Sequence, residues 1–126
     1  MLELDAMKTH RMIFALLLAA TAMPVSATST MCAFEGSGGS SSYSIELIGY
    51  GEIETIQMNL PAGPRSLPAG SYKILEFDKE KGRINLAYRN PGDPSLPPSF
   101  TLEGMGKNVH LTVGEERIAG ELHCDL

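Results

Sequence analysis

Residues 99–124 read "SFTLEGMGKNVHLTVGEERIAGELHC", and this stretch decides the predicted fold. Apolar and polar residues alternate along three short runs, and glycine stands in each of the two gaps between them. A period of two residues is the pattern of a strand that buries one face. Short gaps that contain glycine are typical of hairpins between antiparallel neighbours. The stretch therefore predicts three consecutive antiparallel strands.

The register of such hairpins can be predicted, because apolar side chains on one face must lie opposite one another. In the C-terminal stretch we expect turns at residues 105–106 and 114–117. An earlier hairpin, with its turn at residues 79–82, follows the same rule and places Asp78 opposite Arg83 as a surface ion pair. The apolar pairs predicted for the three hairpins are Leu102–Val109, Phe100–Leu111, Val113–Ile118, Leu111–Gly120, Val109–Leu122, Phe77–Ile84 and Leu75–Leu86.

The rest of the chain continues the pattern of strands and turns, and no window keeps a helical period. In the first hairpin Glu54 would fall opposite Leu47, so we expect a β-bulge near residues 49–51. The fold class is therefore all-β: a small antiparallel meander that forms a barrel or a two-layer sandwich of about seven strands. The predicted strands are 43–49, 52–59, 71–78, 83–90, 99–104, 107–114 and 117–124.

The N-terminal residues predict export. Lys8 and Arg11 precede a short apolar run, and small residues follow at 25–27. This order is that of a secretory signal peptide. We expect residues 1–27 to be the signal peptide, with the true start at Met7 and cleavage after Ala27. Residues 28–42 would form an N-terminal segment with a Gly/Ser linker, and residues 43–126 the β-domain.

The two cysteines, Cys32 and Cys124, lie near opposite ends of the mature chain. In an exported protein such a pair predicts a disulfide, and a free or metal-binding pair is the alternative. The bond would place the N-terminal segment beside the last strand and cover its edge. The expected location is exported, either periplasmic or secreted.

Composition excludes several functions. The chain has 10 basic and 15 acidic residues, a net charge of −5 and no basic run. This balance argues against nucleic acid and anionic membrane surfaces as partners. No membrane insertion is expected after signal cleavage, since no second apolar segment is long enough to span a bilayer. No catalytic or phosphate-binding motif occurs, so we predict a protein that is not an enzyme and needs no cofactor. The oligomeric state is left open.

The polar face of the last two strands carries one candidate metal site. In the predicted register His110 lies opposite Glu121, with His123 on the same face. Two imidazoles and a carboxylate can bind zinc or copper. The alternative is a solvated outer face with a His–Glu contact.

Two proline-rich loops are the main binding candidates. Residues 90–99, "NPGDPSLPPS", contain four prolines, and residues 60–72, "LPAGPRSLPAGSY", contain Leu-Pro-Ala-Gly twice, each predicted to turn with Pro at its second position. Stiff exposed loops lose little entropy on binding, so they suit protein recognition; the alternative is that the prolines only block edge pairing. The expected partner is another envelope or extracellular protein, and an enzyme inhibitor or immunity-type protein is one form. A structural envelope component and a small-ligand or metal-binding barrel are the alternatives. The candidate binding residues are Ser66, Pro68, Gly70, Tyr72, Asp93, Pro94, Leu96, Pro97 and Pro98.

In size, signal peptide, cysteine pair and expected small barrel, the chain resembles the periplasmic lysozyme inhibitors of the membrane-bound and C-type kind. That family inserts a Ser-x-x-Gly-x-x-Tyr loop into the lysozyme cleft. Here Ser66, Gly70 and Tyr72 have the spacing Ser-x-x-x-Gly-x-Tyr. The resemblance therefore concerns architecture and not the motif, and we do not place the chain in that family.

Overall fold

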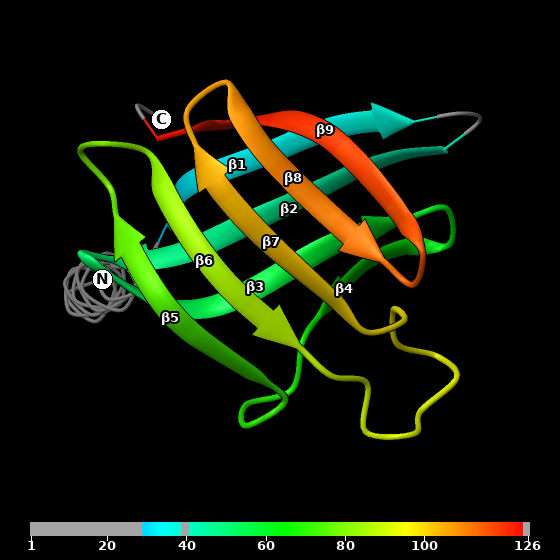
Figure 1. The fold of residues 1–126 in the computed structure, drawn as a ribbon. Coiled ribbons are helices and arrows are strands. Elements are labelled where there is room, and N and C mark those ends of the chain that lie inside the picture. Colours follow the sequence, from blue (N-terminus) through cyan, green and yellow to red (C-terminus); the bar gives the residue numbers. More distant parts are fainter. Residues whose placement is uncertain (1–28, 39–40, 125–126) are drawn as a thin grey trace, which may run out of the picture.

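The computed structural model of the chain describes residues 29–38 and 41–124 (Figure 1). The described residues form strands and turns only, which confirms the predicted all-β class, but there are nine strands and not seven. The predicted signal peptide, residues 1–27, lies outside the described residues. The strands are β1 (Ser29–Gly38), β2 (Ser41–Tyr50), β3 (Glu52–Leu60), β4 (Gly63–Ser66), β5 (Tyr72–Asp78), β6 (Arg83–Tyr88), β7 (Phe100–Met105), β8 (Asn108–Val113) and β9 (Glu116–His123).

All nine strands belong to one antiparallel sheet in the order β4-β3-β2-β1-β9-β8-β7-β6-β5. Consecutive strands pair everywhere except at β4 and β5, which are the two edges of the sheet. The first and last strands pair instead, through Ala33–His123 to Gly36–Gly120. The sheet curls so that β5–β8 pass in front of β1–β4 (Figure 1). The result is a half-barrel whose two edge strands, β4 and β5, are not paired with each other. Only a weak bond crosses the open side of the half-barrel among the described residues, from the Tyr72 hydroxyl to the Glu54 carbonyl at 3.4 Å.

Residues 36–38 and 41–42 of the predicted N-terminal segment with its Gly/Ser linker lie in strands. Gly36 and Gly38 belong to β1, and Ser42 belongs to β2, so these residues do not link a separate segment to the first strand. The composition resembles a flexible linker, but β1 is held by pairing with β2 on one side and β9 on the other. As predicted, this N-terminal segment covers the edge of the last strand.

Strand β4 was not predicted, and it separates the two Leu-Pro-Ala-Gly tetrapeptides. The first forms the β3–β4 hairpin, in which Leu60 pairs with Gly63 and Pro61 has the predicted second position. The second forms a different turn, in which Pro68 is the first residue and Ser71 N–H donates to its carbonyl at 3.1 Å. Because β4 is a four-residue edge strand, it tolerates Pro64.

The predicted register has the correct parity but is shifted by two residues in the two C-terminal hairpins. In β7–β8 Leu102 faces Leu111, and in β8–β9 Leu111 faces Ile118, two residues from the predicted partners. The turns are therefore Gly106-Lys107 and Gly114-Glu115. Each begins with glycine at positive φ, +58° and +61°, as a type II′ turn requires.

The β5–β6 hairpin differs for another reason. Phe77 faces Ile84 as predicted, but a bulge at Leu75 makes Ile74, and not Leu75, face Leu86. Leu75 is consequently 58% exposed. The bulge predicted near residues 49–51 is confirmed, because the β2–β3 register shifts after Ile48 and leaves Glu54 without a partner.

The core lies between the front and back strands of the curled sheet, and no charged side chain among the described residues is buried. The predicted disulfide joins Cys32 to Cys124 beside the β1–β9 pair, across a separation of 92 residues. Within residues 29–38 and 41–124 no helix is long and apolar enough to cross a membrane. The core residues include Phe34, Ile45, Leu47, Ile56, Met58, Ile84, Leu86, Leu102, Val109, Leu111 and Ile118.

Candidate functional site at the loop end

The second half of the 60–72 loop, residues 67–71, lies at the same end of the half-barrel as the loop 90–99, whereas the β3–β4 hairpin at residues 60–63 lies elsewhere (Figure 1). Residues 67–71 and the loop 90–99 are joined where β5 begins and β6 ends, because the Arg89 N–H donates to the Ser71 carbonyl at 2.9 Å. The bond continues the β5–β6 ladder beyond Tyr72–Tyr88, so it holds the bases of the two loops next to each other. The sequence could not show this proximity.

The shorter loop, residues 67–71, is held at both ends. The side chain of Leu67 is buried, and its N–H donates to the Ile56 carbonyl at 2.9 Å. The Ser71 hydroxyl also donates to the Pro68 carbonyl, at 2.6 Å. Gly70 has φ +88°, which suits the third position of this turn. Pro68 and Gly70 are thus presented to solvent by a turn with little freedom.

The longer loop, residues 90–99, is organised by the side chain of Asn90. Its Oδ1 accepts from the N–H groups of Gly92 and Asp93 at 2.7 and 2.8 Å. Its Nδ2 donates to the carbonyls of Asp93 and Pro97 at 2.9 and 2.8 Å. One amide therefore bridges the two arms of the loop and satisfies backbone groups that the prolines leave without partners.

Tyr88 and Asp93 complete the internal bonds of this loop. The buried Tyr88 hydroxyl donates to the Pro97 carbonyl at 2.9 Å, and the Tyr88 ring packs on Phe100 with centroids 5.0 Å apart. Asp93 Oδ1 accepts from the Ser95 N–H and hydroxyl at 2.9 and 2.7 Å. These bonds lower the pKa of Asp93 below its ordinary value. Burial, followed by the charge of Asp93, raises the pKa of Tyr88.

The predicted binding residues do not share one environment. Tyr72 and Leu96 are half-buried, and Pro97 is buried as part of the loop's internal structure. Pro97 therefore supports the loop from within, and its carbonyl accepts from Tyr88 and Asn90. The residues that remain exposed at this end are Ser66, Pro68, Gly70, Asp93, Pro94 and Pro98.

A groove of about 560 Å³ lies next to the loops, on the outer face of β5–β8. Its floor is a row of register partners, Lys73, Ala87, Thr101 and Thr112, that point away from the core because their strand neighbours are buried or half-buried. Arg89 and Ser99 from the loops border the row. The alternating sequence pattern predicts that the floor residues lie on the outer face of the sheet. Only the pairing of the four strands places them side by side.

The predicted metal site is not assembled. His110 lies opposite Ala119 on β9 and Glu103 on β7, so its predicted pairing with Glu121 is wrong. Glu121 instead contacts His123, at 3.2 Å. No group of three His, Cys, Asp or Glu side chains that could hold a metal ion occurs in the part of the chain that the structure describes.

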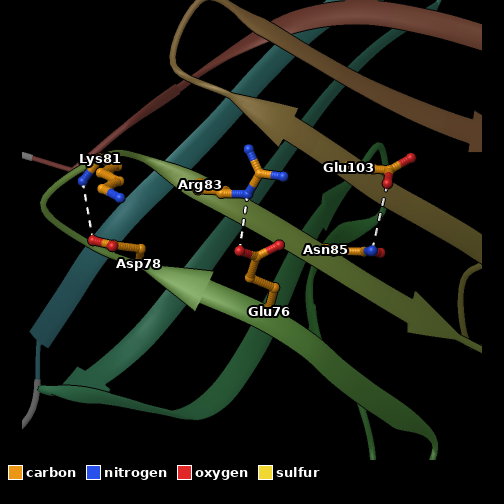
Figure 2. Close-up of polar contacts among 6 residues, drawn as sticks. All are labelled: Glu76, Asp78, Lys81, Arg83, Asn85 and Glu103. Carbon is orange, nitrogen blue, oxygen red and sulfur yellow. Dashed lines mark hydrogen bonds and ion pairs between the residues drawn. The ribbon is translucent and has the colours of Figure 1, made fainter.

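The outer face around these residues carries a different set of polar contacts (Figure 2). Arg83 Nε pairs with Glu76 at 2.9 Å, and this contact raises the pKa of Arg83. The predicted Asp78–Arg83 ion pair does not form although the two residues are register partners, since Arg83 pairs with Glu76, and Asp78 accepts from the Lys81 N–H at 3.1 Å in the turn. Asn85 donates to Glu103 at 3.4 Å. All of these groups are exposed or half-buried, as in the solvated alternative.

Comparison with protein-family models, with curated proteins and with solved structures finds no match to this chain.

Proposed function

We propose that the protein is exported and binds another envelope or extracellular protein through the exposed surface of its two proline-rich loops, without catalysing a reaction. The observation that carries the proposal is the Arg89–Ser71 backbone bond of 2.9 Å, which joins two loops that are each held by internal bonds. A surface ordered before binding loses little entropy when a partner docks. An enzyme inhibitor or immunity-type protein is a concrete form of this function.

Export is supported by two features. The predicted signal peptide at residues 1–27 has the order of charged, apolar and small residues that export requires. The Cys32–Cys124 disulfide fits an oxidising compartment such as the periplasm or the extracellular space.

The test is affinity capture from an envelope extract with the purified exported protein. A loop variant combines Pro68→Ala, Pro94→Ala and Pro98→Ala, all of them exposed positions outside the internal bonds of Asn90. A control variant, Lys79→Ala with Glu80→Ala, changes the β5–β6 turn at the other end of β5. We expect the loop variant to lose a captured protein that the wild type and the control retain. Equal capture by all three forms would refute loop-mediated binding.

A further inference from the structure

The groove beside the loops differs in charge from the rest of the molecule. The chain has a net charge of −5, yet Lys73 and Arg89 line the groove, and none of its described lining residues is acidic. Both side chains are exposed. The two ion pairs found between described residues, Arg83–Glu76 and His123–Glu121, involve neither of them. The groove is thus a local cationic site on an acidic protein.

We propose that this groove binds an acidic, extended segment of the partner protein, with carboxylates placed against Lys73 and Arg89. The inference rests on the proposed function and names the chemistry that the partner presents. Opposite charges on the two surfaces favour encounter and fix the register of docking.

The shape of the groove fits an extended polypeptide. Three of the four floor residues, Ala87, Thr101 and Thr112, have small side chains in neighbouring strands and leave room for a backbone to lie beside Lys73. Hydroxyl groups on Thr101, Thr112 and Ser99 can donate to carbonyl or carboxylate oxygens. Its volume of about 560 Å³ lies within the usual range for ligand sites.

A second group of cations helps to test the assignment. Lys79, Lys81 and Lys107 line a separate cleft at the opposite end of β5 and β6, but Glu80 and Glu121 line that cleft too. Mixed charges reduce its preference for an acidic segment. These lysines therefore provide a matched control with the same charge change at another place.

The experiment uses an eight-residue peptide of alternating Glu and Thr, blocked at both ends, and the same peptide with Gln in place of Glu. Binding to the purified protein is followed by amide chemical shifts and by titration at low and high salt. We expect saturable shifts at Thr101 and Thr112, weaker binding in salt, and much weaker binding of the Gln peptide. The variant Lys73→Gln with Arg89→Gln should bind about tenfold more weakly, since each exposed charge pair is a modest contribution.

The control variant Lys79→Gln with Lys107→Gln should bind as the wild type does. Equal losses in both variants, equal binding of the Gln peptide, shifts centred on Lys107, or no saturable binding would each overturn the inference. Tighter binding of an oligogalacturonate than of the Glu peptide would also overturn it, and would assign the groove to acidic carbohydrate.

Failure of this inference can be separated from failure of the proposed function. If Lys73→Gln with Arg89→Gln leaves envelope capture intact while the loop-proline variant abolishes it, the loops bind a partner and the groove does not contribute. If the Glu peptide binds in the groove but no variant changes capture, the groove accepts acidic segments and the proposed role of the loops is wrong.

Discussion

Gly36 lies directly opposite Gly120 where β1 pairs with β9, and the ring of Phe34 covers both glycines. A Cβ on Gly120 would lie 2.6 Å from Phe34 Cε1 and would also meet the Glu35 carbonyl. The close approach requires glycine at this point, although neither residue has positive φ. The pair therefore explains why a glycine-rich segment forms a strand here.

Substitution of Gly120 by Ala should destabilise the protein. The added methyl overpacks a site bordered by a buried ring and by backbone, so we expect a loss of about 2–3 kcal/mol in the free energy of unfolding. Urea denaturation measures it. Gly38→Ala is the matched control, because its Cβ would meet only the side chain of Ile118, at 3.3 Å, and should cost clearly less. Equal effects would contradict the packing described.

Removal of the Cys32–Cys124 bond should lower stability strongly. The bond closes a loop with a separation of 92 residues, for which the chain-entropy model gives about 4–5 kcal/mol as an upper value. Denaturation of the wild type with and without reductant, and of the Cys32→Ala, Cys124→Ala double variant, measures the loss. Thiol titration of the denatured, unreduced protein should detect no free cysteine. One or two free thiols would show that the bond is not formed.

Replacement of Asn90 by Ala should loosen residues 90–99 and leave the sheet intact. The variant loses two bonds at Oδ1 and two short bonds at Nδ2. We expect a loss of about 1–3 kcal/mol. Faster amide exchange at Gly92 and Asp93, with unchanged exchange in β7 and β8, would show that the effect is local. Asn90→Asp tests the Oδ1 and Nδ2 bonds separately, since the carboxylate keeps the acceptor at Oδ1 and removes the N–H donors of Nδ2.

Acid should loosen the same loop through Asp93. Its pKa is lowered in the folded protein, chiefly by the Ser95 hydroxyl and then by the Ser95 N–H. The stabilisation is complete above the ordinary value of 3.8 and is lost as the pH falls through the lower folded pKa. An NMR titration of the Asp93 carboxyl should give a pKa below 3.8, and Ser95→Ala should raise it. A pKa insensitive to Ser95→Ala would refute this cause.

The bulge in β5 can be tested with two neighbouring apolar residues. Leu75 is 58% exposed, whereas Ile74 points inward opposite Leu86. Leu75→Ala should therefore be almost neutral, and Ile74→Ala should cost about 1–2 kcal/mol, less than a fully buried isoleucine. If Leu75→Ala instead proves the more destabilising variant in urea denaturation, the register without a bulge is correct and the bulge is refuted.

The hairpins show how far the sequence predicts this fold. Alternation identifies which residues face the core, and these faces are correct for Leu102, Val109 and Leu111. A register shift of two residues keeps every side chain on its face, so alternation alone cannot choose between the registers. The choice depends on the turn. Reading Gly106 and Gly114 as first residues of type II′ turns would have given the observed pairing.

The binding surface is less predictable, because it depends on contacts between distant segments. Proline content identified both loops, but it could not distinguish the exposed Pro94 from the buried Pro97. That difference depends on Tyr88 and Asn90, which bond the Pro97 carbonyl. The groove depends on the pairing of four strands, and its cations, Lys73 and Arg89, lie 16 positions apart in the sequence.

The pairing of β1 with β9 has a consequence for biosynthesis. It is the sole ladder between the β1–β4 and β5–β9 parts of the described sheet, and it joins the first strand to the last. As the chain leaves the ribosome, β1 can pair with β2 early. Its other edge can pair only after β9 has also been synthesised. Contacts so distant in sequence form slowly. The domain therefore reaches its native topology only after β9 has been synthesised, and until then the edge of β1 that β9 occupies stays unpaired.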